Sequence, residues 1–284
     1  MTLIDIQEIE CGYRDGFHLG PVDMKIKKGS FTGIIGPNGS GKSTLFKCLT
    51  GDLSLRKGHI DLCGKPLSSY SLKERARMLS IVTQFCELAP MTVGEYVLMG
   101  RMPYRKMFQF YYSEQDNEIA DYYIKLTGIE HLREKQITEL SGGEQQMASI
   151  ALALTQEPEV LLLDEATSHL DITHQIRILN LLQKLNEETG LTIVMIIHDL
   201  NMASEYCSDL FLMKKGSLYR AGTPTDVLTY EHIEEVYKTI VLVGNNPLSD
   251  KPVIYPVSGK RLDEHKNQYE KQKDTLVSTP RTNH

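Results

Sequence analysis

Long apolar runs and leader-like segments are missing from this sequence. No stretch of its 284 residues approaches the roughly 20 consecutive apolar residues that cross a bilayer. The start, MTLIDIQEIE, also lacks the basic and then apolar pattern of a secretion signal. We therefore expect a chain that stays in the cytosol.

Cysteine is scarce and scattered. The five cysteines include no C-x-x-C pair, so the sequence indicates neither a disulfide framework nor a zinc site. We expect reduced and mostly buried thiols at Cys11, Cys48, Cys63, Cys86 and Cys207.

An excess of positive charge is absent as well. The formal net charge is −6, whereas a nucleic-acid partner favours a basic domain. The short basic cluster of Lys25, Lys27 and Lys28 is expected to be a solvated face rather than a binding patch. We predict no nucleic-acid partner.

What the sequence does contain is typical of a globular α/β protein. Hydrophobic residues make up 41% of it and charged residues 24%, and the length allows one or two domains. Three β-rich apolar runs suit strands that are covered on both faces, as in a parallel sheet. They span residues 31–35, 160–163 and 192–197. The runs lead into Gly36, Asp164 and His198, and ligands collect at such carboxyl ends of strands.

Helical periodicity supplies the crossovers that a parallel sheet needs. Apolar residues recur at helical spacing in two segments, and Gly190 follows the second as a stop signal. The repeats are Met147, Ile150, Ala151 and Leu154, and Ile178, Leu181, Leu182 and Leu185. We expect a main domain over 1–243 with a helical insertion at about 86–157, an ordered appendix at 244–258, and a polar, flexible tail at 259–284.

A glycine-rich loop follows the first apolar run. Residues 36–43 read G-P-N-G-S-G-K-S, an unbroken G-x-x-x-x-G-K-[ST] motif that precedes a helix beginning near Lys42. Its backbone N–H groups can surround phosphate oxygens, and the helix N-terminus adds partial positive charge. Lys42 is expected to pair with the β- and γ-phosphates, and Ser43 to ligate Mg²⁺. The alternative is a glycine-rich turn with an exposed lysine.

Two adjacent carboxylates close the second apolar run. Asp164 can hold Mg²⁺ through a water, and Glu165 can accept a proton from a water that attacks the γ-phosphate. A strand end that simply meets solvent is the alternative. The phosphate loop upstream favours the catalytic interpretation.

The segment Leu140–Gln146, LSGGEQQ, resembles the signature sequence of the ATP-binding cassette (ABC) ATPases. The order of phosphate loop, Gln84, signature, Asp164–Glu165, Asp171 and His198 is similar to that family from about residue 1 to 243. The resemblance implies a P-loop NTPase sheet core of the ABC type, with a small antiparallel β region and a helical subdomain. It also implies an ATPase that uses ATP and Mg²⁺.

The same resemblance implies individual roles. Tyr13 would stack on adenine, Gln84 would reach Mg²⁺ and the attacking water, and His198 would hold the γ-phosphate. Taken singly, these could be a surface tyrosine, a loop glutamine and a satisfied core histidine. The nucleotide contacts would come from Tyr13, Gly36, Pro37, Asn38, Gly39, Ser40, Gly41, Lys42, Ser43, Thr44, Ser141, Gly142, Gly143, Glu144 and Asp171.

The signature segment has a physical logic of its own. Ser141 can cap the helix that follows, while Gly142 and Gly143 let a phosphate approach free N–H groups. In the family this surface meets ATP bound to a second subunit, so a complete site needs two copies of the chain. Asp171 would lie at that seam. His169 and His174 are expected to be packing or surface residues.

The sequence departs from the family pattern at several positions. Glu144 stands where glutamine is common, and Met147 where arginine is. Thr83 and Ala166 each replace a usual proline. None of these changes removes a group that handles phosphate, metal or protons.

A cassette without fused membrane spans points to an importer subunit or to a soluble ATPase of iron–sulfur cluster assembly. Residues 91–105, MTVGEYVLMGRMPYR, resemble the T-V-x-x-x-V-x-x-G-R-x-P-Y segment of importers for iron–siderophore, haem and cobalamin. TSHLDITHQ at 167–175 and the ending GTPTDVLTYEHIEEVY followed by KPVIYPV are similar to that group too. The expected partners are permease subunits and, indirectly, a solute-binding protein, at the cytoplasmic face of the membrane.

An aromatic run lies in the expected helical insertion. With the neighbouring Arg105 and Lys106 it suits a groove that receives a permease helix. Core packing of the insertion is the alternative. The run consists of Tyr104, Phe108, Phe110, Tyr111 and Tyr112.

Overall fold

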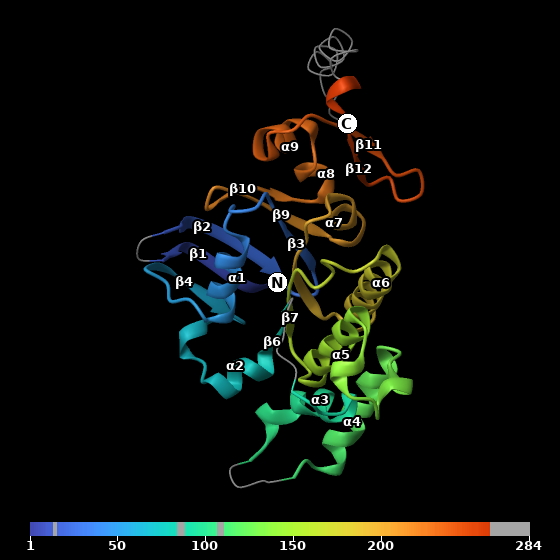
Figure 1. Cartoon of the computed structure of the whole chain (residues 1–284). Coiled ribbons are helices and arrows are strands. Elements are labelled where there is room, and N and C mark those ends of the chain that lie inside the picture. The colour runs from blue at the N-terminus through green and yellow to red at the C-terminus, as the bar shows by residue number, and fades with distance from the viewer. Residues whose placement is uncertain (14–15, 84–88, 107–110, 262–284) are drawn as a thin grey trace.

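A six-stranded sheet forms the centre of the molecule (Figure 1). The computed structural model describes residues 1–13, 16–83, 89–106 and 111–261. In spatial order the strands are β10 (Ser217–Gly222), β9 (Asp209–Lys214), β3 (Phe31–Ile35), β8 (Thr192–Ile196), β7 (Val160–Asp164) and β6 (Leu79–Val82). All neighbours pair in parallel except β10, which runs antiparallel to β9. The three apolar runs are thus confirmed as adjacent parallel strands.

A second, antiparallel sheet packs against one face of the first. Its order is β2 (His18–Lys27), β1 (Thr2–Gly12), β4 (Lys57–Leu62) and β5 (Lys65–Pro66). Alternate residues of the central strands, such as Ile34, Leu162 and Val194, join one apolar cluster with this sheet and with helix α1 (Lys42–Thr50). The small antiparallel region and the helix start at Lys42 are both confirmed.

Helices cover the other face. The intervening strand residues, such as Ile35, Leu161 and Met195, belong to a second apolar cluster. The longest helices in it are α5 (Gly142–Thr155) and α6 (Ile172–Thr189). As predicted, Gly190 ends α6 in the left-handed conformation, with φ 70°.

The described part of the expected insertion is mainly helical and lies at one end of the molecule (Figure 1). It contains α3 (Val93–Leu98), η2 (Met99–Tyr104), α4 (Glu114–Leu126), η3 (Glu130–Leu132), η4 (Ile137–Glu139) and α5. Before it come η1 (Leu67–Ser69) and α2 (Leu72–Met78).

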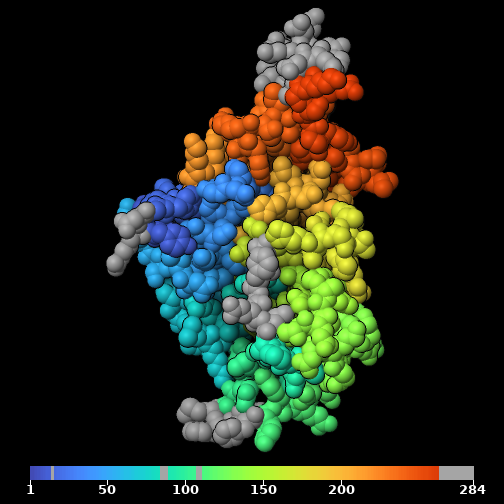
Figure 2. All heavy atoms as spheres, in the orientation of Figure 1, coloured from blue at the N-terminus to red at the C-terminus, as the bar shows by residue number. Residues whose placement is uncertain are grey.

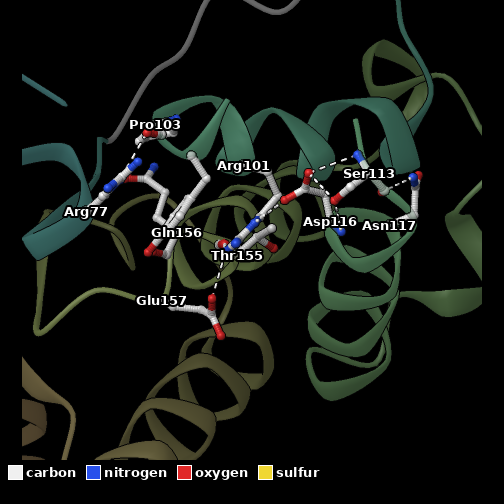
Figure 3. A network of polar contacts seen from close by, with 10 residues as sticks. Arg77, Arg101, Pro103, Ser113, Asp116, Asn117, Thr155, Gln156 and Glu157 are labelled. Atoms are coloured by element: carbon white, nitrogen blue, oxygen red, sulfur yellow. Dashed lines mark hydrogen bonds and ion pairs between the residues drawn. The ribbon is translucent and has the colours of Figure 1, made fainter. Parts of the chain in front are cut away.

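A buried arginine ties this helical region together (Figure 3). Arg101 Nε donates to Asp116 Oδ1 at 3.0 Å, and Nη1 donates to the Thr155 carbonyl at 2.9 Å and to Glu157 Oε2 at 2.8 Å. Its guanidinium carbon lies 3.8 Å from the Tyr104 ring centroid. One side chain therefore joins η2, the start of α4 and the end of α5.

The described members of the expected aromatic run differ in their surroundings. Tyr104 is packed between Arg101 and Arg77, and its hydroxyl donates to the Gln156 carbonyl at 2.8 Å. Tyr111 is 85% exposed. Tyr104 is therefore a packing residue of the helical region, whereas Tyr111 is available for docking. Phe108 and Phe110 lie outside the described residues.

Apart from β9 and β10, which belong to the central sheet, the chain after β8 lies mainly at the opposite end of the molecule (Figures 1 and 2). It comprises α7 (Leu200–Tyr206), α8 (Pro224–Val227), α9 (Tyr230–Tyr237) and a hairpin of β11 (Val241–Asn245) and β12 (Pro252–Pro256). Ser204 Oγ of α7 donates to the Pro252 carbonyl at 2.7 Å. The boundary expected after residue 243 falls inside β11, and residues 262–284 of the tail lie outside the described residues.

The described cysteines and helices can be compared with what the sequence predicts. Cys11, Cys48 and Cys207 are buried free thiols, and Cys63 is a half-buried one. Cys86 lies outside the described part of the chain. Among the helices that the structure describes, none combines the length and apolar character of a membrane span.

Candidate functional site

The glycine loop connects β3 to α1 in a conformation that requires glycine. Gly36, Gly39 and Gly41 have φ values of 148°, 75° and 105°. A Cβ at Gly36 would lie 2.5 Å from the Met213 carbonyl oxygen, and one at Gly41 would lie 2.7 Å from Leu19 Cδ1. The loop is therefore confined between β9 and the antiparallel sheet, and its backbone is held in one shape.

Lys42 is the first residue of α1 and is only 5% exposed. Its Nζ donates to the carbonyls of Gly36 at 2.8 Å and Pro37 at 3.2 Å, so it lies across the loop. Burial lowers the pKa of Lys42, and the charges of Glu165 and Asp164 partly oppose that shift. A buried ammonium that faces a glycine loop suits an anionic ligand such as a phosphate.

A cavity of about 330 Å³ opens over the loop. Residues 38, 39, 41 and 42–44 line it together with Phe17 and Glu165. None of the described residues that line it comes from the signature segment or from Asp171. Phe17 was not expected here. It lies between β1 and β2, and only the fold of these two strands brings its ring to within 2.9 Å of a Cβ built at Gly41.

Asp164 and Glu165 stand at the end of β7, next to the end of β8. Burial, helped by the charge of Glu165, raises the pKa of Asp164. Glu165 has φ 53°, a left-handed conformation that is uncommon for residues other than glycine and is often found at functional sites. Its Oε1 lies 2.6 Å from His198 Nε2. Because Asp164 pairs with Ile196 across the strands, the sheet itself brings the carboxylates and His198 together.

The signature segment begins α5 with a complete capping box. Ser141 is the N-cap, and Glu144 Oε2 accepts from the Ser141 backbone N–H at 2.8 Å and from its hydroxyl at 2.7 Å. Glutamate in place of the usual glutamine therefore has a local role, because it satisfies the cap. The two hydrogen bonds from Ser141 lower the pKa of Glu144. Ser141 and Gly142 remain exposed at the surface.

Asp171 begins α6 directly beside the signature. Its Oδ1 accepts from the His174 backbone N–H at 3.0 Å, and its Oδ2 lies 2.7 Å from His174 Nδ1. These bonds hold the pKa of Asp171 below its usual value. Leu170 Cδ2 lies 4.0 Å from a Cβ built at Gly142. Of the two alternatives expected for His174, packing or surface, packing applies on one side of the ring, since a Cβ built at Gly143 would lie 2.4 Å from His174 Cδ2.

The remaining expected site residues fall in different places. Tyr13 follows β1 and is 47% exposed, and its hydroxyl lies 3.4 Å from Lys47 Nζ on α1. Gln84 lies outside the described residues. The structure therefore brings one group of expected residues together at the loop cavity and a second group, Ser141 to Glu144 with Asp171, on a separate surface.

A parallel sheet, a glycine loop of this sequence and a helix that starts at the loop lysine define a P-loop nucleotide-binding protein. The family model "ABC transporter" matches residues 19–168. The chain therefore belongs to the ABC transporter family, as one of the ATP-binding subunits that hydrolyse ATP to drive transport.

Individual proteins give the same result. The ferric enterobactin transport ATP-binding protein FepC of Escherichia coli (strain K12) is 37% identical over 252 residues, which cover 88% of this chain and 93% of that protein. A solved inward-facing ABC transporter, assigned to the metal-chelate type, has a TM-score of 0.81 at 25% identity and covers 92% of this chain and 100% of its own. A solved dimeric bacterial ABC transporter cassette has a TM-score of 0.69 at 29% identity, with 78% and 98% covered.

Proposed function

We propose that the chain powers an importer by closing as a dimer around two ATP molecules, with each ATP held between the phosphate loop of one copy and the signature of the other. The observation that carries this proposal is the division of the site. Lys42 and Glu165 share one cavity, while Ser141 and Asp171 lie on a separate surface of the same chain. A second copy supplies the missing half.

The chemistry would proceed from the loop cavity. Lys42 would exchange its two carbonyl partners for the β- and γ-phosphates, a charge-assisted contact in place of neutral ones. The Ser43 hydroxyl and the Asp164 carboxylate are the hard oxygen donors that Mg²⁺ prefers, so these residues fit that ion, and Mg²⁺ would neutralise charge on the phosphates. The resemblance to the family adds Gln84 as a third residue that would contact Mg²⁺.

Glu165 would accept the proton of the attacking water, and His198 would contact the γ-phosphate. In the structure these two side chains pair with each other at 2.6 Å. Bound ATP would therefore compete with Glu165 for His198. Release of the Glu165 carboxylate from this pair would make it available as a base only when nucleotide is present.

The transported cargo is proposed to be a metal complex such as iron–siderophore, haem or cobalamin. Support comes from FepC, the ATP-binding protein of ferric enterobactin transport, and from the metal-chelate type assigned to the solved transporter. The chain would bind permease subunits at the cytoplasmic face of the membrane, with a solute-binding protein delivering cargo from the other side. The soluble iron–sulfur assembly ATPase has no comparable support.

The domain organisation follows from this function. Residues 1–243 would form the ATPase domain, with the helical insertion at about 86–157 as its permease-facing part. Residues 244–258, which hold the end of β11 and all of β12, would be a C-terminal appendix. Isolation of the complex from cells, with the permease identified in it, would test the cargo class: a permease for another class of solute would contradict it.

The shared site can be tested with Glu165→Gln. Loss of a positioned general base costs roughly 10² to 10⁴ in rate, so this variant should bind Mg-ATP, hardly hydrolyse it and accumulate as a dimer in light scattering. Addition of Ser141→Arg should abolish the dimer, because a long side chain would fill the phosphate position at the signature. A Glu165→Gln protein that stays monomeric in saturating Mg-ATP, alone and with its permease, would contradict the proposal.

A further inference from the structure

Two neighbouring helices begin with the same arrangement. In α5 the cap Ser141 pairs with Glu144 three residues later, and in α6 the cap Asp171 pairs with His174 at the same spacing. In each helix the next residue is a glutamine whose Nε2 donates to two carbonyls of the preceding loop. These bonds join Gln145 to Leu140 (3.1 Å) and Ile137 (3.3 Å), and Gln175 to Leu170 (3.0 Å) and Thr167 (3.1 Å).

The N-terminal caps of α5 and α6 differ in what the residue paired with the cap, Glu144 or His174, contacts. Glu144 serves its own cap, whereas His174 reaches from α6 to the signature turn of α5. A Cβ built at Gly143 would lie 2.4 Å from His174 Cδ2 and 2.8 Å from its Cγ, so the ring lies directly against the glycine. The same ring holds Asp171 Oδ2 at 2.7 Å. One imidazole therefore contacts both the signature turn and Asp171.

The His174 ring contacts a glycine of the signature turn on one side and the Asp171 carboxylate on the other. Gly143 has no side chain, and the loop before Asp171 contains His169 in a left-handed conformation with φ 64°. The Asp171 side chain is 62% exposed. Without the ring bond, the carboxylate would keep only its Oδ1 bond from the His174 backbone N–H, and Oδ2 would lose its 2.7 Å contact.

We propose that His174 is a positioning residue that fixes Asp171 against the signature turn, so that one subunit presents both to the second copy as a single preformed surface. The inference rests on the proposed shared site. It differs from a role in starting α6, because a capping role would affect the stability of the monomer and nothing more.

The test uses the Glu165→Gln background, in which dimer formation can be titrated. His174→Ala should raise the protein concentration needed for the ATP-bound dimer by about tenfold or more, the effect of losing one charge-assisted hydrogen bond. The ATP affinity of the monomer and its melting temperature should stay close to those of the parent. Thr173→Ala is the matched control, since this exposed neighbour lies on the same turn of α6, and it should dimerise like the parent.

Two further variants separate the contacts. His174→Asn places an amide donor where Nδ1 stood and loses the ring against Gly143, whereas His174→Phe keeps a ring and loses the donor. Each should dimerise at a concentration between those of the parent and His174→Ala. If His174→Ala fails to fold, these two variants test the proposal in its place.

The outcomes are distinguishable. If all His174 variants dimerise like the Glu165→Gln parent, or if their dimerisation falls only in step with melting temperature, the positioning role is wrong. If the parent itself stays monomeric with Mg-ATP, the shared-site function fails instead. In the otherwise native chain, His174→Ala should lower kcat at saturating ATP more than it changes KM.

Discussion

At the scale of single residues, the charges in the loop cavity and at the adjoining end of β7 are arranged for a ligand rather than for stability. Lys42 is buried with a lowered pKa and Asp164 with a raised one, so the fold disfavours the ionised form of each. Groups of this kind destabilise the nucleotide-free protein and become favourable when opposite charge arrives.

We predict that Asp164→Asn stabilises the nucleotide-free protein at neutral pH while hydrolysis is lost. The folded pKa of Asp164 lies above its unfolded value of about 3.9, so the native state loses stability as the pH rises through the folded pKa. The gain from the amide should therefore be largest at neutral pH and vanish as the pH falls towards about 4. Urea unfolding at several pH values measures it, and a gain that grows at low pH would contradict the stated sign.

Tyr13 gives a second prediction at this scale. If its ring stacks on adenine, Tyr13→Ala should weaken ATP binding by roughly 1 to 3 kcal/mol and leave kcat nearly unchanged. Tyr219→Ala is a matched control, because Tyr219 is also partly exposed beside a lysine, with Lys214 Nζ 5.1 Å from its ring centroid. Calorimetric titration compares the two. Should Phe17→Ala lose affinity while Tyr13→Ala does not, Phe17 is the platform.

At the scale of elements, the segment that resembles the importer group proves to hold the helical region together. Arg101 lies in this segment and joins η2, α4 and α5, and removal of one partner from a buried ion pair typically costs about 3 to 5 kcal/mol. Arg101→Ala should lower the free energy of unfolding by that order. Arg133→Ala, which breaks only exposed ion pairs to Asp121 and Glu134, should cost about 1 kcal/mol or less. Equal losses in urea unfolding would contradict this assignment.

The elements also explain what the sequence could predict. The strands 31–35, 160–163 and 192–197 were predictable because parallel strands are apolar on both faces, and the α5 cap because its bonds span three residues of the chain. Arg101 was not: its partners Asp116 and Glu157 lie far along the chain, and nothing local marks them.

Some residues of the candidate site were predictable from the sequence and others were not. The loop glycines and Lys42 follow from a motif whose spacing is fixed by phosphate geometry. Phe17 and His174 do not, because each reaches its contact only through tertiary packing. The position of His174, three residues after the N-cap Asp171, was a local signal for the bond between them. Nothing in the sequence indicates the contact between His174 and Gly143.

At the scale of the whole molecule, the helical region and the C-terminal hairpin lie at opposite ends, with the sheets between them (Figure 1). Tyr111 is an aromatic residue of the helical region that is 85% exposed, so little of it is buried in the fold. Exposed aromatic side chains of this kind are common anchors at protein interfaces.

We predict that Tyr111→Ala weakens recovery of the permease and lowers transport, while ATP binding and the melting curve of the isolated subunit stay unchanged. Tyr122→Ala is the control, since Tyr122 is 60% exposed in the same region. Pull-down of the permease and a melting curve on one sample separate docking from folding. Equal recovery with both variants would exclude Tyr111 as an anchor.

The separation of the loop cavity from the signature surface also has a kinetic consequence. If hydrolysis needs two copies, the rate for free subunits rises with the square of their concentration when they are dilute. A permease that holds two copies side by side replaces that encounter with an effective local concentration that reaches the millimolar range for short tethers. Free subunits would then consume little ATP, and turnover would be confined to assembled transporters.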